Sequence, residues 1–456
     1  MLEACHTQYP GSNGVQIQRL FVGLDFGTAF TKVVIARSSD SFAVKLRPAL
    51  DGIDGYLQPG LFAQDADGRH RLLNAPDDGR SVQNLKLVLM QRPENPNHLA
   101  MANAAVFLGL VLQQARVQFM ADHRDIFRNS RLDWHLNIGL PAESFNNLRL
   151  RDAFRKVAEI AWMLSVLDGT VAECMFDIAR RAVRAPDPLD DRRLAAAEER
   201  FIHHDNIGVL PEVQAETICY ATSSLRNNGL HLLVDVGAGT LDVNVFALIA
   251  NADEDRYVSH CARVFHLGSA YLAKHRVTQL EARGLLRDRP MVSRFTEYAA
   301  IPGRRELAKD LQVSEDDIED IDGVFLNEVG TAIWDAVNQV RKEYGNKVHR
   351  WRQDRLPAFL AGGGSTDDAY HDRLRLVHIH RKLYGWAGLE IRSLPKPDRL
   401  QMPGMPEAGF HRLAVAYGLA HDLLNLGDFI PPDQTPVVST APIADYRANY
   451  PGQEQV

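Results

Sequence analysis

Short apolar runs on either side of glycine turns are the clearest pattern along the chain. Residues 20–26 (LFVGLDF) and 31–36 (TKVVIA) flank one such turn and predict a β-hairpin. Residues 230–249 (LHLLVDVGAGTLDVNVFALI) repeat the arrangement. An apolar run at 357–361 leads into three glycines and predicts a further strand, and residues 134–141 (WHLNIGLP) predict a buried one.

Apolar residues at helical spacing lie between these strands. They predict helices over residues 101–120, 148–164 and 412–426. The alternating histidines of VHIH (377–380) predict a short strand with both histidines on one solvated face. Strands that alternate with helices indicate an α/β protein. The two glycine-turn units lie about 210 residues apart, and we interpret them as the openings of two similar halves with a cleft between them.

The position of the two units predicts where the halves begin and end. Residues 20–215 would form a first lobe and residues 216–410 a second. Within them we expect a polar surface insertion at 182–200 and a helical subdomain at about 269–345. The remaining segments are predicted to be, in chain order, a flexible leader at 1–19, a returning helix at 411–429 and an extended proline-rich tail at 430–456.

Composition narrows the class of protein without identifying it. The 456 residues are 45% hydrophobic and 24% charged, which is ordinary for a globular chain of two or three domains. A net charge of −7 disfavours binding to nucleic acid or to an anionic membrane. No apolar stretch approaches the length of a membrane span, and the first residues lack a secretory pattern. Four widely spaced cysteines suit a reducing compartment, so we expect a cytoplasmic protein.

The glycine turns have the chemistry of a phosphate site. A turn without a Cβ lets backbone amides approach an anion, and Thr28, Thr31 and Thr240 would add hydroxyl donors. Asp25 and Asp235 would repel a phosphate, so a cation such as Mg²⁺ must lie between them. The plainer alternative for either turn is an ordinary hairpin in which Asp and Gly only form the bend. The chain contains neither a Walker P-loop nor a GxGxxG motif, which excludes those two nucleotide folds.

Five motifs, in order, resemble those of the superfamily that contains actin, the DnaK-type heat-shock chaperones and the sugar kinases. Each is weak alone, and together they span about residues 20–425. DFGTAFTK (25–32) is similar to the first phosphate motif of that superfamily, and DVGAGTLD (235–242) is similar to the second. AGGGST (361–366) is similar to the adenosine motif. PEVQAETICYA (211–221) is similar to the first connecting helix, and AVAYGLA (414–420) to the second. The resemblance implies a duplicated, actin-like (ribonuclease H-like) ATPase fold with two lobes and a nucleotide cleft between them.

The resemblance also implies roles for individual residues. Asp25 and Asp235 would hold Mg²⁺ through water, and Glu212 would order the metal waters or the attacking water. The phosphates of ATP would meet the two glycine turns, and the adenosine would lie on the glycines of the third motif. The residues implied in ligand binding are Gly27, Thr28, Thr31, Lys32, Gly237, Gly239 and Thr240 for the phosphates, and Gly363, Gly364 and Ser365 for the adenosine.

Two assignments within this resemblance stay open. Lys86 resembles the catalytic lysine of the chaperones, whereas Lys32 has the spacing of the actin lysine. We favour Lys86 for catalysis and Lys32 for phosphate binding. The segment RRELAKDL (304–311) is similar to the helix that encloses the adenine, here through Glu306 and Lys309. A solvated helix face with paired charges explains those two residues equally well.

Several functions are compatible with this site. The sequence is nearest to a divergent, DnaK-like nucleotide-binding core without a peptide-binding domain, which predicts slow ATP hydrolysis that drives closure of the lobes. A protein partner or co-chaperone would sense that closure, with no nucleic acid or membrane involved. The alternatives are an actin-like ATPase that assembles into filaments and a small-molecule kinase of the same fold. A pseudo-ATPase scaffold is disfavoured by intact Asp25, Asp235 and Glu212.

Overall fold

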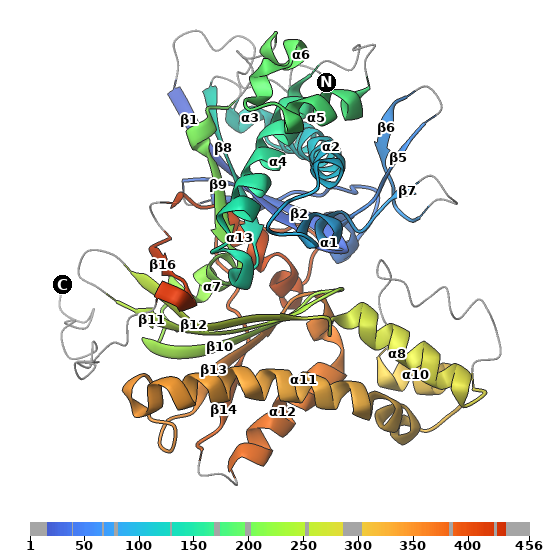
Figure 1. Ribbon diagram of the computed structural model, residues 1–456, viewed down its shortest axis with the longest axis vertical. Helices are drawn as coiled ribbons and strands as arrows, with labels where there is room; N and C mark the ends of the chain where they lie inside the picture. Colours follow the sequence, from blue (N-terminus) through green and yellow to red (C-terminus); the bar gives the residue numbers. More distant parts are fainter. Residues whose placement is uncertain are drawn as a thin grey trace.

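A computed structural model shows a mixed α/β protein with two large sheets and a small one (Figure 1). The observations below concern the residues that this structure describes. They are 16–38, 40–65, 68–76, 81–127, 130–167, 174–196, 202–250, 255–285, 303–382, 386–423 and 426–434.

The first sheet has seven strands in the described residues, and the hairpin of the first glycine turn lies at its centre. β1 (Gln16–Phe26) pairs antiparallel with β2 (Phe30–Arg37) and parallel with β8 (Ser130–Leu140). The order across the sheet is β15 (Leu400–Gln401), β3 (Asp40–Ala43), β2, β1, β8 and β9 (Ile207–Pro211), with β4 (Gln58–Pro59) paired to β2.

The second sheet has six strands in the same described ranges, with the second glycine-turn hairpin at its centre. β10 (Gly229–Val236) pairs antiparallel with β11 (Leu241–Ile249) and parallel with β13 (Leu356–Ala361). The order is β14 (Leu389–Arg392), β13, β10, β11, β12 (Arg256–Phe265) and β16 (Asp428–Ile430). Five strands, β3-β2-β1-β8-β9 and β12-β11-β10-β13-β14, therefore follow the same order and the same relative directions in the two sheets.

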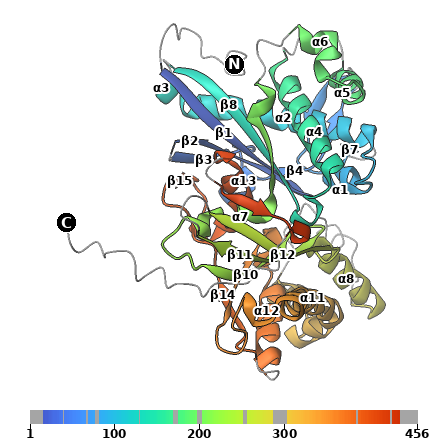
Figure 2. The same cartoon turned by 60° about the vertical axis from the view of Figure 1, so that its left-hand side comes forward.

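Helices cover the outer face of each sheet (Figures 1 and 2). On the first sheet α2 (His98–Asp122) and α4 (Leu148–Val166) form the centre of the larger apolar core. Among the described helices, only α2 is long and apolar enough to cross a bilayer, but 67% of its most apolar stretch is buried inside the protein. That is the position of a core helix. The shorter helices and strands of this part are β5 (Phe62–Gln64), β6 (His70–Leu72), β7 (Ser81–Val82), α1 (Leu85–Met90), α3 (Arg124–Phe127), α5 (Met175–Arg184) and α6 (Arg192–Ala195).

The second sheet is covered by α11 (Glu315–Tyr344) and α12 (Asp368–Lys382), with α8 (Ser269–Ala282) and α10 (Arg304–Leu311) at one end (Figure 1). Ser314 and Asp317 form a capping box at the start of α11, which satisfies amide groups that the first turn leaves unpaired. Leu307 and Ala308 of α10 pack with Leu280, Ile318 and Ile321 in a separate small core.

Two helices fill the space between the sheets. α7 (Glu212–Ala221) and α13 (Ala414–Leu419) share an apolar cluster with residues from β2, β10, β11 and β13. They cross at Gly418, where an added Cβ would lie 1.8 Å from the carbonyl oxygen of Ala215. Only glycine permits this approach, which fixes the two sheets relative to each other through α7 and α13.

Both hairpins, the strands at 134–141 and 357–361 and the first two helices are confirmed, with small shifts in their ends. The returning helix predicted at 411–429 is wrong, because the helix spans only Ala414–Leu419. The Asn137 side chain donates to the carbonyl oxygens of Leu419 and His421, so the chain turns away and enters the second sheet as β16.

Other predicted boundaries also differ. The leader predicted at 1–19 includes the first four residues of β1, and residues 1–15 lie outside the described residues. The second lobe was predicted to extend to residue 410, but β15 within that range pairs with β3 of the first sheet. The insertion predicted at 182–200 begins inside α5, whose Ala182 is buried. The predicted VHIH strand is part of α12, and of the tail only residues 430–434 are described.

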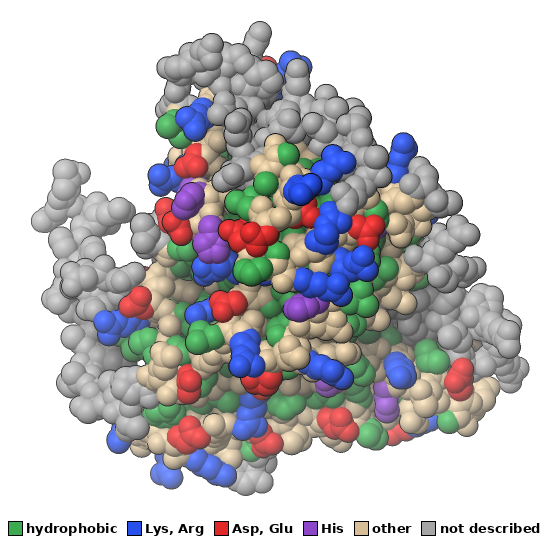
Figure 3. Space-filling view, turned by 45° about the horizontal axis from the view of Figure 1, so that its top comes forward, with side chains coloured by type: hydrophobic (Ala, Val, Ile, Leu, Met, Phe, Trp, Pro, Cys, Tyr) green, Lys and Arg blue, Asp and Glu red, His purple; other side chains and the backbone are tan. Residues whose placement is uncertain are grey.

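Acidic and basic side chains are interspersed over the described part of the face shown in Figure 3. This distribution agrees with the modest net charge of the chain.

Candidate functional site

The two glycine turns face each other between the sheets. Each turn follows a central strand whose second-last residue is an aspartate, and each aspartate lies seven residues before its cross-strand partner. Asp25 is paired in register with Lys32, and Asp235 with Asp242. An added Cβ on Gly239 would lie 3.0 Å from the methyl carbon of Thr28, so the two turns are in near contact.

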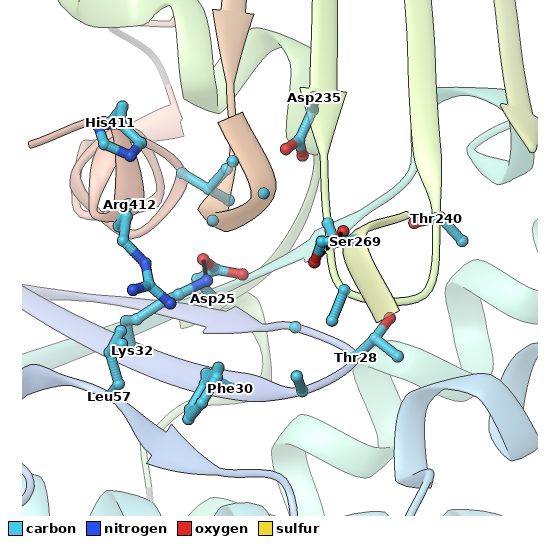
Figure 4. A pocket seen from close by; sticks show the side chains of 18 of the residues that line it. Asp25, Thr28, Phe30, Lys32, Leu57, Asp235, Thr240, Ser269, His411 and Arg412 are labelled. Atoms are coloured by element: carbon cyan, nitrogen blue, oxygen red, sulfur yellow. Dashed lines mark hydrogen bonds and ion pairs between the residues drawn. The ribbon is translucent and has the colours of Figure 1, made fainter. Parts of the chain in front are cut away.

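A cavity of about 190 Å³ opens beside this contact and is lined by residues from both sheets (Figure 4). β1, β2, α1 and α7 form one side, and β10, β11, α8 and the glycine segment after β13 form the other. The residues predicted for the site that line it are Asp25, Gly27, Thr28, Lys32, Lys86, Glu212, Asp235, Gly237, Thr240, Gly363 and Gly364.

Two buried ion pairs cross the cavity floor. Lys32 Nζ lies 2.6 Å from Asp25 Oδ2, as an antiparallel neighbour in the β1–β2 hairpin. Lys86 Nζ lies 2.6 Å from Glu212 Oε1, and both side chains are nearly inaccessible to solvent. Lys86 comes from the first turn of α1, which starts after Asn84 in the left-handed backbone region. Burying such a pair is costly, which is why ion pairs of this kind often mark functional sites.

The cavity is lined by more carboxyl groups than basic side chains. Five carboxylates interact closely, and we refer to them as the carboxylate cluster: Asp25, Glu212, Glu216, Asp235 and Asp242. Burial raises the pKa of Asp235 to about 7, with a further increase from Glu212. Burial, followed by the charge of Asp235, raises the pKa of both Glu216 and Asp242 well above the usual carboxyl range.

The Lys86–Glu212 pair reflects the same imbalance. Burial lowers the pKa of Lys86, but the adjacent Glu212 carboxylate outweighs this effect and the net pKa is raised. Burial raises the pKa of Glu212, and Lys86 opposes that increase. An excess of negative charge raises the pKa of acids and bases alike, so the cavity favours the binding of an additional cation.

Unpaired oxygens in the cluster fit a hydrated magnesium ion. Glu216 Oε1, Asp235 Oδ1 and Asp242 Oδ1 are buried and have no hydrogen-bond partner among the described residues. Buried carboxylate oxygens without donors are the ligands that Mg²⁺ and its bound waters prefer. Within the described ranges, no group of three His, Cys, Asp or Glu side chains is placed to hold a metal ion directly.

The third glycine segment shapes the cavity beside Asp235. Gly362 has a φ of 80°, and an added Cβ would lie 1.9 Å from Asp235 Oδ1. A side chain at this position would therefore displace the carboxylate. The next residues form a short 3-10 helix, Gly363–Thr366, whose Gly363, Gly364 and Thr366 line the cavity.

Five predicted site residues do not line this cavity. Side chains alternate along β2, so Phe30 and Lys32 face the cavity while Thr31 points into the buried opposite side. Gly239 lies at the contact between the turns, and Ser365 is turned back onto the carbonyl of Gly362. Glu306 and Lys309 are exposed on α10, so the structure does not bring them to the cavity.

Several lining residues were absent from the sequence prediction. Glu216 lies four residues after Glu212, and this spacing places both carboxylates on one face of α7. Asp242 lies opposite Asp235 across the turn, as Lys32 lies opposite Asp25. Both signals were present in the sequence. Further lining residues include Asp54, Leu57, Ser269, Asp367, His411 and Arg412, which no local pattern indicates.

Comparisons with known proteins do not assign the chain to a family. No model of a known protein family matches the chain, and no curated protein sequence matches it.

Proposed function

We propose that this protein is an ATPase of the duplicated, actin-like type, in which Mg-ATP binds in the cavity and its slow hydrolysis controls closure of two lobes. The observation that carries the proposal is the pair of equivalent turns. Each follows the central strand of its sheet, each begins with an aspartate, and the two meet over a cavity rich in carboxylates. Such a cavity suits a nucleotide polyphosphate bound together with Mg²⁺.

The matching strand order supports a duplication. Both sheets have a hairpin followed by two parallel strands, and each hairpin carries a turn of the same length between Asp25 and Lys32 or between Asp235 and Asp242. An independent origin of the two turns would not require the same order, directions and spacing. We therefore place a first lobe around the first sheet and a second lobe around the second.

The residues of the site would divide the work of phosphoryl transfer. Amides of the two turns, with Thr28 and Thr240, would bind phosphate oxygens. Lys86 would stabilise charge on the transferred phosphoryl group, and Glu212 would orient the attacking water. Bound Mg²⁺ would neutralise charge between the phosphates and the carboxylates of Asp25 and Asp235. Gly363 and Gly364 would let the nucleoside approach the backbone.

We further propose that the switch acts on a protein partner in the cytoplasm. The reducing compartment agrees with Cys174, Cys219 and Cys261, which form no disulfide in the described residues. Closure of two lobes around a nucleotide is a movement that a second protein can sense.

The first test is sedimentation of the purified protein with Mg-ATP, with Mg-ADP and without nucleotide, with phosphate release measured on the same samples. Protein that stays in the supernatant and releases phosphate slowly would support the switch. A pellet that forms only with ATP above a critical concentration would favour the filament alternative. Absence of both ATP binding and phosphate release would refute the proposed function.

Two variants separate binding from hydrolysis. Asp25→Ala removes a carboxylate proposed to hold Mg²⁺, so it should weaken Mg-ATP binding by orders of magnitude. Glu212→Gln keeps the shape of the side chain and should bind ATP while releasing phosphate about 100-fold more slowly. A folded Asp25→Ala protein with unchanged ATP affinity would refute the site assignment.

A further inference from the structure

Arg412 differs from the other two cations of the cavity, because no carboxylate in the described part of the chain is paired with it. Three cationic side chains line the cavity, and Lys32 and Lys86 are each held by a carboxylate at 2.6 Å. Arg412 makes no hydrogen bond or ion pair to any residue of the described ranges, and its buried Nε has no acceptor there. A buried guanidinium group without an acceptor is costly, so this donor is available to a ligand.

The guanidinium group is nevertheless held in place. Its Cζ lies 5.7 Å from the centre of the Phe30 ring, on β2. On another side, an added Cβ at Gly363 would lie 3.2 Å from Nη2 and 3.4 Å from Nε. Arg412 itself ends the 3-10 helix Glu407–Arg412, directly before α13. Residues from both sheets therefore orient the group, and little ordering is needed when a ligand binds.

The surroundings favour an anion over a neutral group. Figure 4 shows the Arg412 side chain directed toward Lys32 and Asp25, on the side of the cavity opposite Ser269 and Thr240. Lys32 lies next to the first glycine turn, because its Nζ would be 3.5 Å from a Cβ on Gly27. Burial lowers the pKa of Arg412, with Asp54 opposing this effect, which is the expected result for a desolvated cation that none of the described carboxylates contacts.

We propose that Arg412 is a phosphate-binding residue, whose guanidinium group donates hydrogen bonds to a phosphate of the bound nucleotide on the side of the first glycine turn. This inference rests on the proposed function and adds to it a residue outside the five motifs. A planar guanidinium group offers two parallel donors to a phosphate, which an amine cannot match. Arg412 would therefore contribute to the affinity for the phosphates of the nucleotide and not to the affinity for its nucleoside.

Calorimetric titration of variants tests the inference. ATP, adenosine and inorganic tripolyphosphate, each with Mg²⁺, are titrated into the wild-type protein, Arg412→Gln and Arg412→Lys. We expect Arg412→Gln to lower the affinities for ATP and tripolyphosphate by about 10- to 100-fold and to leave adenosine unchanged. Arg412→Lys keeps the charge but not the paired donors, so it should fall in between.

The matched control is Arg350→Gln. Arg350 is an exposed arginine that pairs with Asp354 on the surface, so the substitution should change none of these affinities. Thermal unfolding of each variant shows whether it is folded. If Arg412→Gln is not folded, Arg412→Lys replaces it as the test variant. An unchanged affinity for tripolyphosphate would overturn the inference. An equal loss for adenosine would also overturn it, since Arg412 would then contact the nucleoside.

The same data separate this inference from the proposed function. If the wild-type protein binds tripolyphosphate but not ATP, and Arg412→Gln weakens tripolyphosphate binding, the ATPase proposal is refuted and the anion site is kept. If the wild-type protein binds ATP and Arg412→Gln binds it with the same affinity, only the inference is refuted. Wild-type protein that binds neither ligand would refute both.

Discussion

Asp235→Asn tests whether the carboxylate cluster is destabilising until a cation binds. Asp235 is the second-last residue of β10 and lies opposite Asp242, and one oxygen of its carboxyl group has no partner among the described residues. Its pKa is raised by burial from an ordinary 3.8 to about 7. A raised carboxyl pKa means that the folded protein keeps its proton to higher pH than the unfolded chain does. The folded protein therefore loses stability as the pH rises from about 4 to 7, and this loss is complete above pH 7.

The pKa difference sets the size of the effect. A change from 3.8 to about 7 corresponds to about 4 kcal/mol of stability lost above pH 7. Asparagine keeps part of the burial cost and loses the attraction to Lys32, so we expect the substitution to recover about half, or ~2 kcal/mol. With an unfolding entropy of about 1 kcal/mol per degree for a chain of this length, the unfolding midpoint should rise by about 2 °C if the chain unfolds as a unit. It should rise by about 4 °C if the second lobe unfolds alone.

The assay is thermal unfolding of the wild-type protein and Asp235→Asn without ligand, at pH 5 and at pH 8. The variant should be more stable at pH 8 and gain less at pH 5, and addition of Mg-ATP should stabilise only the wild-type protein. Asp335→Asn, an exposed position on α11, is the control and should change neither midpoint. A variant that is less stable at pH 8, or equally stabilised at both pH values, would refute the account of the cluster.

Three further predictions concern the framework around the site. Gly418→Ala places a methyl group 1.8 Å from the Ala215 carbonyl oxygen, so it should cost at least about 2 kcal/mol and lower the unfolding midpoint; an unchanged midpoint would contradict the close crossing of α7 and α13. Gly323→Ala lies within α11 with open space around it and should instead stabilise the protein by about 0.5–1 kcal/mol in the same assay, which makes it a matched glycine control. Asp322→Ala leaves the fully buried Arg276 without its main partner and should cost about 3–5 kcal/mol in denaturant unfolding. Because Arg276 also holds Asp367 at the cavity wall, any folded Asp322→Ala protein should bind Mg-ATP more weakly; full stability and full affinity would show that this network has no structural role.

The sequence predicted the elements whose own residues specify them. The hairpin strands and α2 are long apolar segments bounded by turn residues, so their pattern is sufficient. β15 and β16 have two and three residues and exist only because distant strands pair with them. α13 stops early because the side chain of Asn137 binds the carbonyl oxygens that follow it, which no local pattern could show.

The residues of the site also fall into those that a local sequence pattern indicates and those that only the fold brings together. The turns carry their chemistry in short motifs, and Glu216 and Asp242 could have been found by asking which residues share a face with Glu212 or oppose Asp235. Arg412 reaches the cavity from the end of a 3-10 helix before α13, and the described residues offer its Nε no acceptor, which only the three-dimensional arrangement reveals. Glu306 and Lys309 show the converse, because a plausible motif on α10 faces solvent one layer away from the cavity.

The difference between the two hairpins explains why ligand binding would act on both lobes. Asp25 has its counter-ion within its own hairpin, because the residue opposite it is Lys32. The residue opposite Asp235 is another carboxyl group, Asp242, so the second hairpin has no internal counter-ion and the pKa of both groups is raised. Two carboxyl groups at opposed positions cannot both ionise without destabilising an antiparallel pair, and the cations that act on Asp235, Lys32 and Lys86, come from β2 and α1 beside the first sheet. In the proposed function, a cation and a polyphosphate bound between the turns would relieve this repulsion only when the turns are close, which would couple occupancy of the site to closure.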